Sequence, residues 1–307
     1  MKTAFVFPGQ GSQKPGMGKD LSGSYAAARK VFDRADKVLG FPLSKTIFEG
    51  TGEELKKTSI TQVALLTVET AIFRVLEEKG FLPQVCAGHS LGEYSALVAA
   101  GSLDFDAALG IVQKRALFME DAGQKARSGM TAVIGLEKAA VEEVLKQVSN
   151  KGIIDVANYN CPGQIVISGE LTALEEALRL AGEKGARMCV PLQVSGGFHS
   201  RLMDEASGRL AAELEPVSIK IPNVSFLSNY SGDFEKDPAN IKEFLVRQVN
   251  NPVRWTDIMQ RMLDSGIDRI VEVGPGKVLS GLWGRFDRTK QVLNVEDIES
   301  LEKLVTA

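Results

Sequence analysis

A serine stands in a glycine-rich turn near the end of the first third of the chain. The segment GHSLG (88–92) matches the pattern GxSxG, which places a serine on a sharp turn between a strand and a helix with its hydroxyl exposed. A short apolar stretch (85–87) precedes the segment, and a helical pattern over 91–100 follows it. This context predicts that Ser90 is a nucleophile. It also predicts that the backbone N–H of Leu91, at the start of the helix, can stabilise an oxyanion.

A serine hydroxyl needs a neighbouring base, and histidine is the usual one because its pKa lies at about 6.5. The chain has two histidines, His89 and His199. His89 is adjacent to Ser90 and would point away from it across the turn. His199 stands in GGFHS (196–200), where glycines let the chain pass close to another element. We therefore expect His199 to be the base. No acid has a position that marks it as the partner that orients this imidazole, and a backbone carbonyl could do so equally well.

Helix lengths predict that an arginine lies near the serine. A helix of about ten residues from Ser90 is about 15 Å long, and the chain then turns near 101–103. A second helix, capped by Asp104, would return about 16 Å by Arg115. If the two helices pack antiparallel, Arg115 is level with Ser90. A guanidinium there could bind a carboxylate through two parallel hydrogen bonds. On geometry alone, an ordinary surface arginine is the alternative.

The elements that must position these residues alternate between strand and helix. Residues 3–7 read as a buried strand that ends in a glycine-rich loop (8–18), and 61–78 have helical spacing. Further on, a strand at 225–229, helices near 239–250 and 255–265, and a strand at 269–274 suit an α/β sheet. Between them, strands at 130–136, 153–158, 164–169 and 186–192 alternate with helices at 137–148 and 171–184 in the order β-α-β-β-α-β. We therefore expect a large α/β-hydrolase-like domain with a mostly parallel sheet (1–126 and 197–307), into which a small ferredoxin-like α+β domain (127–196) is inserted.

Composition excludes several other classes of protein. The 307 residues suit one large domain or two unequal ones, and the net charge of −3 makes nucleic acid a poor partner. The three cysteines form no CxxC pair, which fits a reducing compartment. Two histidines are too few for a histidine-rich metal site, and no DxDxDG loop is present, so we expect no metal. The N-terminus does not match a signal peptide, and no uninterrupted apolar run approaches the about 20 residues of a membrane span. We expect a cytoplasmic monomer that does not bind a membrane.

Seven motifs in order make the chain resemble a known family over its whole length. They are FPGQGSQ (7–13), GHSLGEYSAL (88–97), QKRALFM (113–119), NCPGQIVISG (160–169), GGFHS (196–200), QVNNPVRW (248–255) and VEVGPGKVL (271–279). The chain resembles the malonyl-CoA:acyl-carrier-protein transacylases of fatty-acid synthesis. The resemblance implies a malonyl group carried on Ser90 by a ping-pong mechanism, with malonyl-CoA as a substrate, acyl carrier protein as the acceptor and no cofactor.

The same resemblance implies a role for each site residue. His199 would activate Ser90, and the main-chain carbonyl of Gln248 would orient His199. The backbone amides of Gln10 and Leu91 would form the oxyanion hole, and Arg115 would bind the free malonyl carboxylate. Phe198 would favour malonyl over branched acyl groups.

Other functions fit parts of the sequence. A polyketide pathway would use the same transfer. A serine thioesterase or hydrolase of the α/β-hydrolase type also has GxSxG, but its histidine comes late in the chain, whereas 108 residues follow His199 here. A patatin-like lipase needs a DGG or DGA motif, which is absent. A non-catalytic module that docks a carrier protein is a further alternative, and the lack of long linkers favours a free-standing enzyme over it.

Overall fold

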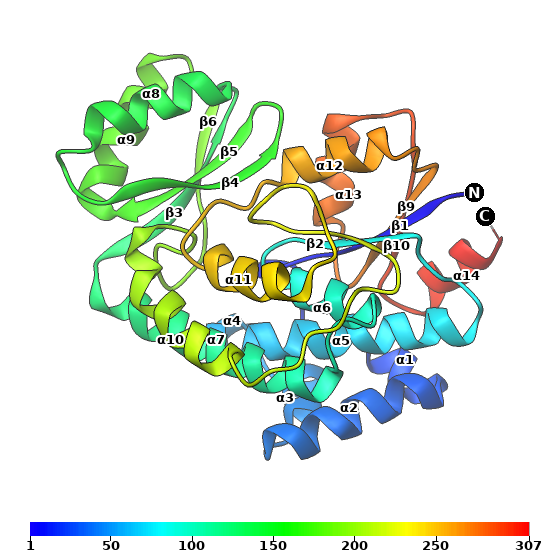
Figure 1. The fold of residues 1–307 in the computed structure, drawn as a ribbon. Helices are drawn as coiled ribbons and strands as arrows, with labels where there is room; N and C mark the ends of the chain where they lie inside the picture. Colours follow the sequence, from blue (N-terminus) through cyan, green and yellow to red (C-terminus); the bar gives the residue numbers. More distant parts are fainter. Residues whose placement is uncertain (307) are drawn as a thin grey trace.

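Helices cover both faces of a mostly parallel sheet, and a second sheet lies at one end of the molecule (Figure 1). The computed structural model describes residues 1–306, which contain one six-stranded and one four-stranded sheet. The strands are β1 (Thr3–Phe7), β2 (Val85–Gly88), β3 (Ser128–Ile134), β4 (Ile154–Cys161), β5 (Gln164–Glu170), β6 (Met188–Pro191), β7 (Ser225–Leu227), β8 (Phe234–Glu235), β9 (Arg269–Val273) and β10 (Gln291–Val295).

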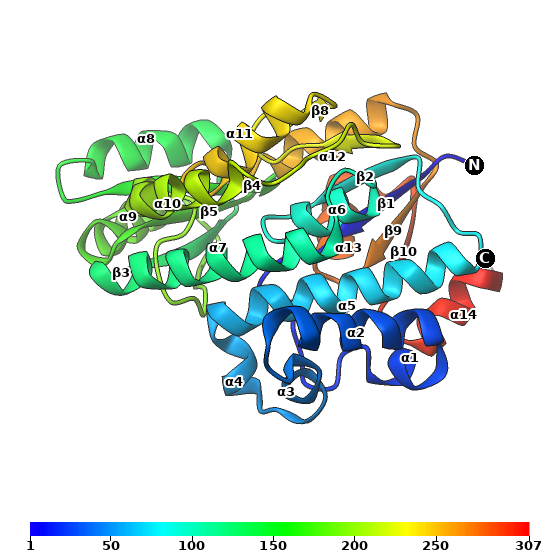
Figure 2. The same ribbon diagram turned by 60° about the horizontal axis from the view of Figure 1, so that its bottom comes forward.

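The helices before the four-stranded sheet are α1 (Lys19–Ser24), α2 (Ala26–Leu39), α3 (Leu43–Glu49), α4 (Gly52–Lys56), α5 (Thr58–Glu78), α6 (Gly92–Ala99) and α7 (Phe105–Lys125). Within or after that sheet come α8 (Lys138–Val148), α9 (Leu171–Glu183), the 3₁₀ turn η1 (Arg201–Met203), α10 (Asp204–Leu214), α11 (Pro238–Gln248), α12 (Trp255–Asp264), α13 (Val278–Phe286) and α14 (Ile298–Thr306). In Figure 2, α1 to α4 lie on the far side of α5 from the sheet.

The six-stranded sheet has the order β10-β9-β1-β2-β7-β8, and its neighbouring strands are parallel except for β7 and β8. Side chains of β1 alternate between two cores. Phe5 and Phe7 pack on the side of α5 and α7, whereas Ala4 and Val6 pack with α12 and α13. A strand buried on both faces in this way is typical of a parallel sheet covered by helices.

Parallel strands bring their carboxyl ends to one edge of the sheet. The loop after β1 begins at Pro8, the turn after β2 holds Ser90, and Ser228 and Asn229 follow β7 directly. Ligands of open α/β sheets bind at this edge. The topology therefore gathers the glycine-rich loop and the predicted nucleophile at one place.

The four-stranded sheet is antiparallel, with the order β4-β5-β3-β6. Its chain order is strand, helix, strand, strand, helix, strand, as the sequence predicted. One face packs against α8 and α9 around Val133, Val144 and Ile167. The other face carries Met130 and Val166 toward the end of the larger sheet.

Helix α5 has the length and composition to cross a membrane, with a mean hydropathy of 1.4 over its most apolar stretch. Within the described chain, however, 83% of that stretch is buried inside the protein. It lies between α2 and α7 and contacts both. An all-round apolar helix covered by its neighbours is a core helix.

Candidate active site

The serine turn is held in a strained conformation by close backbone contacts. Ser90 has a φ of 52°, in the left-handed region that residues other than glycine rarely adopt. A Cβ on Gly92 would lie 2.1 Å from the Phe7 carbonyl oxygen, so the turn can pack against the end of β1 only with glycine there. The side-chain oxygen of Asn229 accepts a hydrogen bond from the Ser90 N–H at 2.7 Å, and its amide nitrogen donates to the Gly88 carbonyl at 2.6 Å. Asn229 thus holds the turn from the end of β7.

His199 contacts the serine hydroxyl directly. Its Nε2 lies 2.8 Å from Ser90 Oγ, and its Nδ1 lies 2.8 Å from the main-chain oxygen of Gln248. A carbonyl oxygen accepts only, so Nδ1 carries the proton and Nε2 presents a lone pair to the hydroxyl. Burial, together with the positive charge of Arg115, lowers the pKa of His199 to about 3. The imidazole is therefore neutral and able to accept the serine proton at neutral pH.

His89 does not contact Ser90 Oγ. Its Nε2 lies 2.9 Å from the side-chain oxygen of Asn160, and its ring packs beside Trp255. This contact crosses from the serine turn to β4 in the smaller sheet. His89 therefore connects the two sheets rather than serving Ser90.

Two backbone N–H groups beside the serine have no hydrogen-bond partner within residues 1–306. They belong to Gln10 and Leu91, and both residues line the same cavity as Ser90. A Cβ on Gly9 would lie 2.5 Å from the His89 carbonyl oxygen, so glycine lets the loop after β1 reach the serine turn. Free N–H groups next to a nucleophile are what an oxyanion hole requires.

Arg115 lies beside Ser90, where the helix lengths predicted it. Asp104 caps α7 through the backbone N–H groups of Asp106 and Ala107, and α7 contacts α6. The Arg115 side chain is only 1% exposed. Its Nη1 donates to Gln62 Oε1 at 2.5 Å, and its Nη2 donates to Gln248 Oε1 at 2.8 Å and to Ser90 Oγ at 3.1 Å. A buried cation thus contacts the nucleophile.

The cavity around these groups has a volume of about 270 Å³ and lies between the two sheets. The carboxyl edge of the large sheet supplies Ser90 and Gln10, and the smaller sheet supplies Met130 and Val166. Phe198 is 4% exposed and lines the cavity next to His199. Six of the seven residues predicted for the site line this cavity. The seventh, Gln248, lies against it and is hydrogen-bonded to Ser90, Arg115 and His199.

Sequence reasoning missed three polar residues that hold this group together: Gln62, Glu93 and Asn229. Gln62 and Glu93 are fully buried in helices α5 and α6, most of whose residues are buried. A long polar side chain at a position expected to be buried was the available signal, since buried polar groups need specific partners. Asn229 follows a predicted strand, and its place at the carboxyl edge of the sheet was the corresponding signal.

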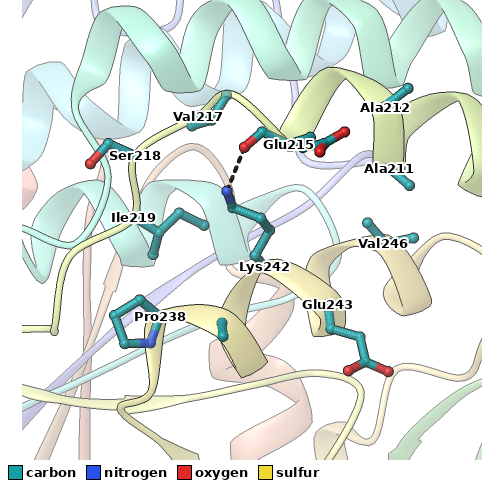
Figure 3. A pocket seen from close by; sticks show the side chains of 11 residues that line it. Ala211, Ala212, Glu215, Val217, Ser218, Ile219, Pro238, Lys242, Glu243 and Val246 are labelled. Carbon is teal, nitrogen blue, oxygen red and sulfur yellow. Dashed lines mark hydrogen bonds between the residues drawn. The ribbon is translucent and has the colours of Figure 1, made fainter.

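A larger hollow of about 750 Å³ lies between α10 and α11, away from Ser90. Figure 3 shows Lys242 reaching across it to the main-chain oxygen of Glu215, at a distance of 2.8 Å. Its other lining side chains are mainly apolar, with Val217, Ile219 and Val246 among them. The only hydroxyl in its lining, Ser218, has no hydrogen bond to Glu215, Glu243 or Lys242 within the described residues, so we place the chemistry in the smaller cavity at Ser90.

Comparisons with known proteins agree over nearly the whole chain. Residues 4–303 match the model of a family described as the acyl transferase domain. A malonyl CoA-acyl carrier protein transacylase of Bacillus subtilis (strain 168) is 45% identical over 302 residues, which cover 98% of this chain and 95% of the relative. An acyl carrier protein S-malonyltransferase from Vibrio cholerae, solved as a crystal structure, superposes with a TM-score of 0.96 at 41% identity, covering 99% of this chain and all of that one. A malonyl-transacylase solved in complex with a type II polyketide acyl-carrier protein has a TM-score of 0.97 at 39% identity, covering 100% of this chain and 99% of that one.

Proposed function

The chain belongs to the acyl transferase domain family, and we propose that it transfers a malonyl group from malonyl-CoA to the pantetheine thiol of an acyl carrier protein in fatty-acid synthesis. The observation that carries the choice of substrate is the position of Arg115. A buried guanidinium 3.1 Å from the nucleophile suits an acyl group with its own carboxylate. An acyl group without a charge would leave this buried cation without an anionic partner in the cavity.

In the first half of the proposed reaction, the malonyl carboxylate binds Arg115. Ser90 Oγ attacks the thioester carbon while its proton passes to His199 Nε2, 2.8 Å away. The N–H groups of Gln10 and Leu91 stabilise the oxyanion of the tetrahedral intermediate. The C–S bond then breaks, and His199 returns the proton to the CoA thiolate. The product is a malonyl ester of Ser90.

In the second half, the pantetheine thiol of the carrier protein gives its proton to His199 and attacks the ester carbon. The C–Oγ bond breaks, and Ser90 recovers the proton from His199. Gln248 keeps the imidazole in the required tautomer through its main-chain oxygen. Phe198 limits the width of the acyl pocket beside His199. In this mechanism the chain itself needs no metal or prosthetic group. CoA is not a cofactor, because it enters as part of the substrate and leaves as a product.

We also propose a division into two domains, an oligomeric state and a location in the cell. We assign the residues 127–196 to a ferredoxin-like domain, on the strength of the strand order β4-β5-β3-β6, and the rest to an α/β-hydrolase-like domain. We propose a monomer in the cytoplasm that engages neither nucleic acid nor a membrane. A polyketide carrier protein is the alternative acceptor, as in the complex of the related malonyl-transacylase.

A transfer assay tests this proposal. The protein is mixed with malonyl-CoA and holo acyl carrier protein, and the mass of the carrier is followed with and without enzyme. We expect malonyl-carrier to form catalytically, and malonyl-CoA to stay intact when no carrier is added. Rapid hydrolysis of malonyl-CoA without an acceptor would instead indicate a hydrolase. Parallel reactions with fatty-acid and polyketide carriers identify the preferred acceptor.

A further inference from the structure

A buried acid that the reaction does not use lies one turn after the nucleophile. Glu93 is in α6, is 1% exposed, and is surrounded by the core around Tyr94 and Leu97. Burying an ionised carboxylate is costly unless hydrogen bonds and a nearby positive charge compensate for the lost water. The partners of Glu93 therefore indicate what it does.

Each oxygen of Glu93 accepts from one N–H group that belongs to the site. The main-chain N–H of Asn229 donates to Oε1 at 3.1 Å, and the side-chain nitrogen of Gln248 donates to Oε2 at 2.5 Å. Asn229 holds the serine turn, and Gln248 contacts both Arg115 and His199. One carboxylate thus connects the end of β7 with the end of α11 beneath the nucleophile.

The contact with Glu93 sets the orientation of the Gln248 amide. The amide nitrogen donates to Glu93 and to the Ser90 carbonyl, which leaves the amide oxygen to accept from Arg115 Nη2. If the amide turned over, its NH₂ group would face the guanidinium, and two donors would oppose each other. The acceptors Glu93 and Ser90 O therefore keep an oxygen in front of Arg115.

We propose that Glu93 is a positioning residue that acts through Gln248 to hold the Arg115 guanidinium toward the acyl pocket. This inference rests on the proposed function, because it assigns Arg115 to the malonyl carboxylate. Among the described residues, Glu93 neither lines the cavity at Ser90 nor hydrogen-bonds His199. Its removal should therefore impair malonyl transfer more than acetyl transfer.

Because Glu93 is ionisable, the pH dependence of malonyl transfer gives a second test of its role. Burial raises the pKa of Glu93 to about 7, against the opposing effects of the Gln248 and Asn229 hydrogen bonds and of Arg115 on α7. Tyr94 on the same helix, Glu69 on α5 and Cys86 on β2 are also buried, and burial raises the pKa of each of them. A proton on either oxygen of Glu93 makes that oxygen a weaker acceptor for its N–H donor. The network therefore favours the ionised form, and malonyl transfer should weaken as the pH falls through about 7.

The test compares Glu93→Gln with Glu69→Gln, which makes the same change in another fully buried acid. Within residues 1–306, the Glu69 oxygens have no hydrogen-bond partner. An amide has one oxygen, so Gln at position 93 cannot accept from both Asn229 and Gln248. We expect kcat/KM for malonyl-CoA to fall about 10- to 100-fold in E93Q, because the loss of a hydrogen bond to a charged group has an effect of this size. We expect acetyl transfer to change by less than about threefold in E93Q, and both rates to stay at the wild-type level in E69Q.

The pH profile completes the test. For the wild type, kcat/KM with malonyl-CoA should have an acid limb, which means that it falls as the pH drops below about 7. The pH dependence of kcat/KM reports pKa values of the free enzyme. The limb should be absent with acetyl-CoA and absent in E93Q. Equal loss of both substrates in E93Q, or an unchanged malonyl rate, would overturn the inference. The wild-type profile decides the case even if E93Q does not fold, because a malonyl profile without that limb also overturns it. A wild-type protein that does not transfer malonyl at all refutes the proposed function instead.

Discussion

Replacing Arg115 with alanine tests how the cavity selects its acyl group. Three hydrogen bonds orient the guanidinium, from Nη1 to Gln62 and from Nη2 to Gln248 and Ser90. The group is 1% exposed, so its interaction with a carboxylate is poorly screened by water. Truncating one partner of a buried charged pair costs about 2–5 kcal/mol. That range corresponds to a loss of about 30- to several-thousand-fold in kcat/KM for malonyl-CoA.

Acetyl transfer should not fall with malonyl transfer in Arg115→Ala. An acetyl group has no carboxylate to lose, and Arg115 is one cause of the lowered pKa of His199. Its removal makes the imidazole a stronger base. We therefore expect Arg115→Ala to keep or increase the rate of acetyl transfer. The rate of malonyl transfer by Arg115→Lys should lie between those of the wild type and Arg115→Ala, because lysine keeps the charge but lacks the planar fork of the guanidinium.

The assay is a competition between malonyl-CoA and acetyl-CoA for the carrier protein, read by the mass of the product. Lys114→Ala is the matched control, because Lys114 is the preceding residue of α7 and is exposed to solvent. It should leave both rates at the wild-type level. A melting curve establishes that each variant is folded. Equal losses of malonyl and acetyl transfer in a folded Arg115→Ala protein would refute the assignment of Arg115 as the carboxylate clamp.

The buried ionisable groups His199 and Glu69 should affect the rate of acylation and the stability of the protein, respectively. His199→Ala should slow acylation of Ser90 by about 10²- to 10⁴-fold as measured by rapid mixing, since the hydroxyl loses its base, and an unchanged rate would show that another group takes the proton. Burial raises the pKa of Glu69 well above its value in the unfolded chain, so the stability that it contributes is fully present below about pH 4.5 and is lost as the pH rises toward the folded pKa. Glu69→Gln should therefore raise the melting temperature more at pH 8 than at pH 4.5, and an equal shift at both pH values would contradict a raised pKa for Glu69.

Much of the site could be predicted because its chemistry is local in sequence. The GxSxG turn predicts that Ser90 is the nucleophile. Because the chain has only two histidines, His199 remains as the predicted base. Helix geometry brought Arg115 level with Ser90 only if the two helices pack antiparallel, and the resemblance to a family decided against an ordinary surface arginine. The position of His199 against Ser90 is a long-range contact, and there the resemblance to a family supplied what spacing could not.

The hydrogen bonds that orient these groups could not be predicted from spacing. Gln248 is separated from Glu93 by 155 residues and from Arg115 by 133. Amides and buried acids leave no periodic pattern, and their partners are set by the packing of whole helices. The orienting partner of His199 is a main-chain oxygen, which every residue possesses. Residue types alone therefore cannot identify it, and only the resemblance carried by QVNNPVRW (248–255) indicated Gln248.

The fold was predicted best where strands and helices are long. The elements of the four-stranded sheet and helices α5, α7, α11 and α12 lie close to the expected ranges. Helix α2 was missed although its buried residues Ala28, Val31, Phe32 and Ala35 follow helical spacing. The two-residue strand β8 and the 3₁₀ turn η1 are too short to give a pattern.

The central claim is that Ser90 carries the malonyl group as an ester. The direct test is the intact mass of the protein after brief mixing with malonyl-CoA, compared with a Ser90→Ala protein. A covalent malonyl-serine adds about 86 Da, and we predict this gain on the wild type alone. An equal gain on Ser90→Ala, or no gain on a folded wild-type protein with malonyl-CoA still intact, would contradict the account.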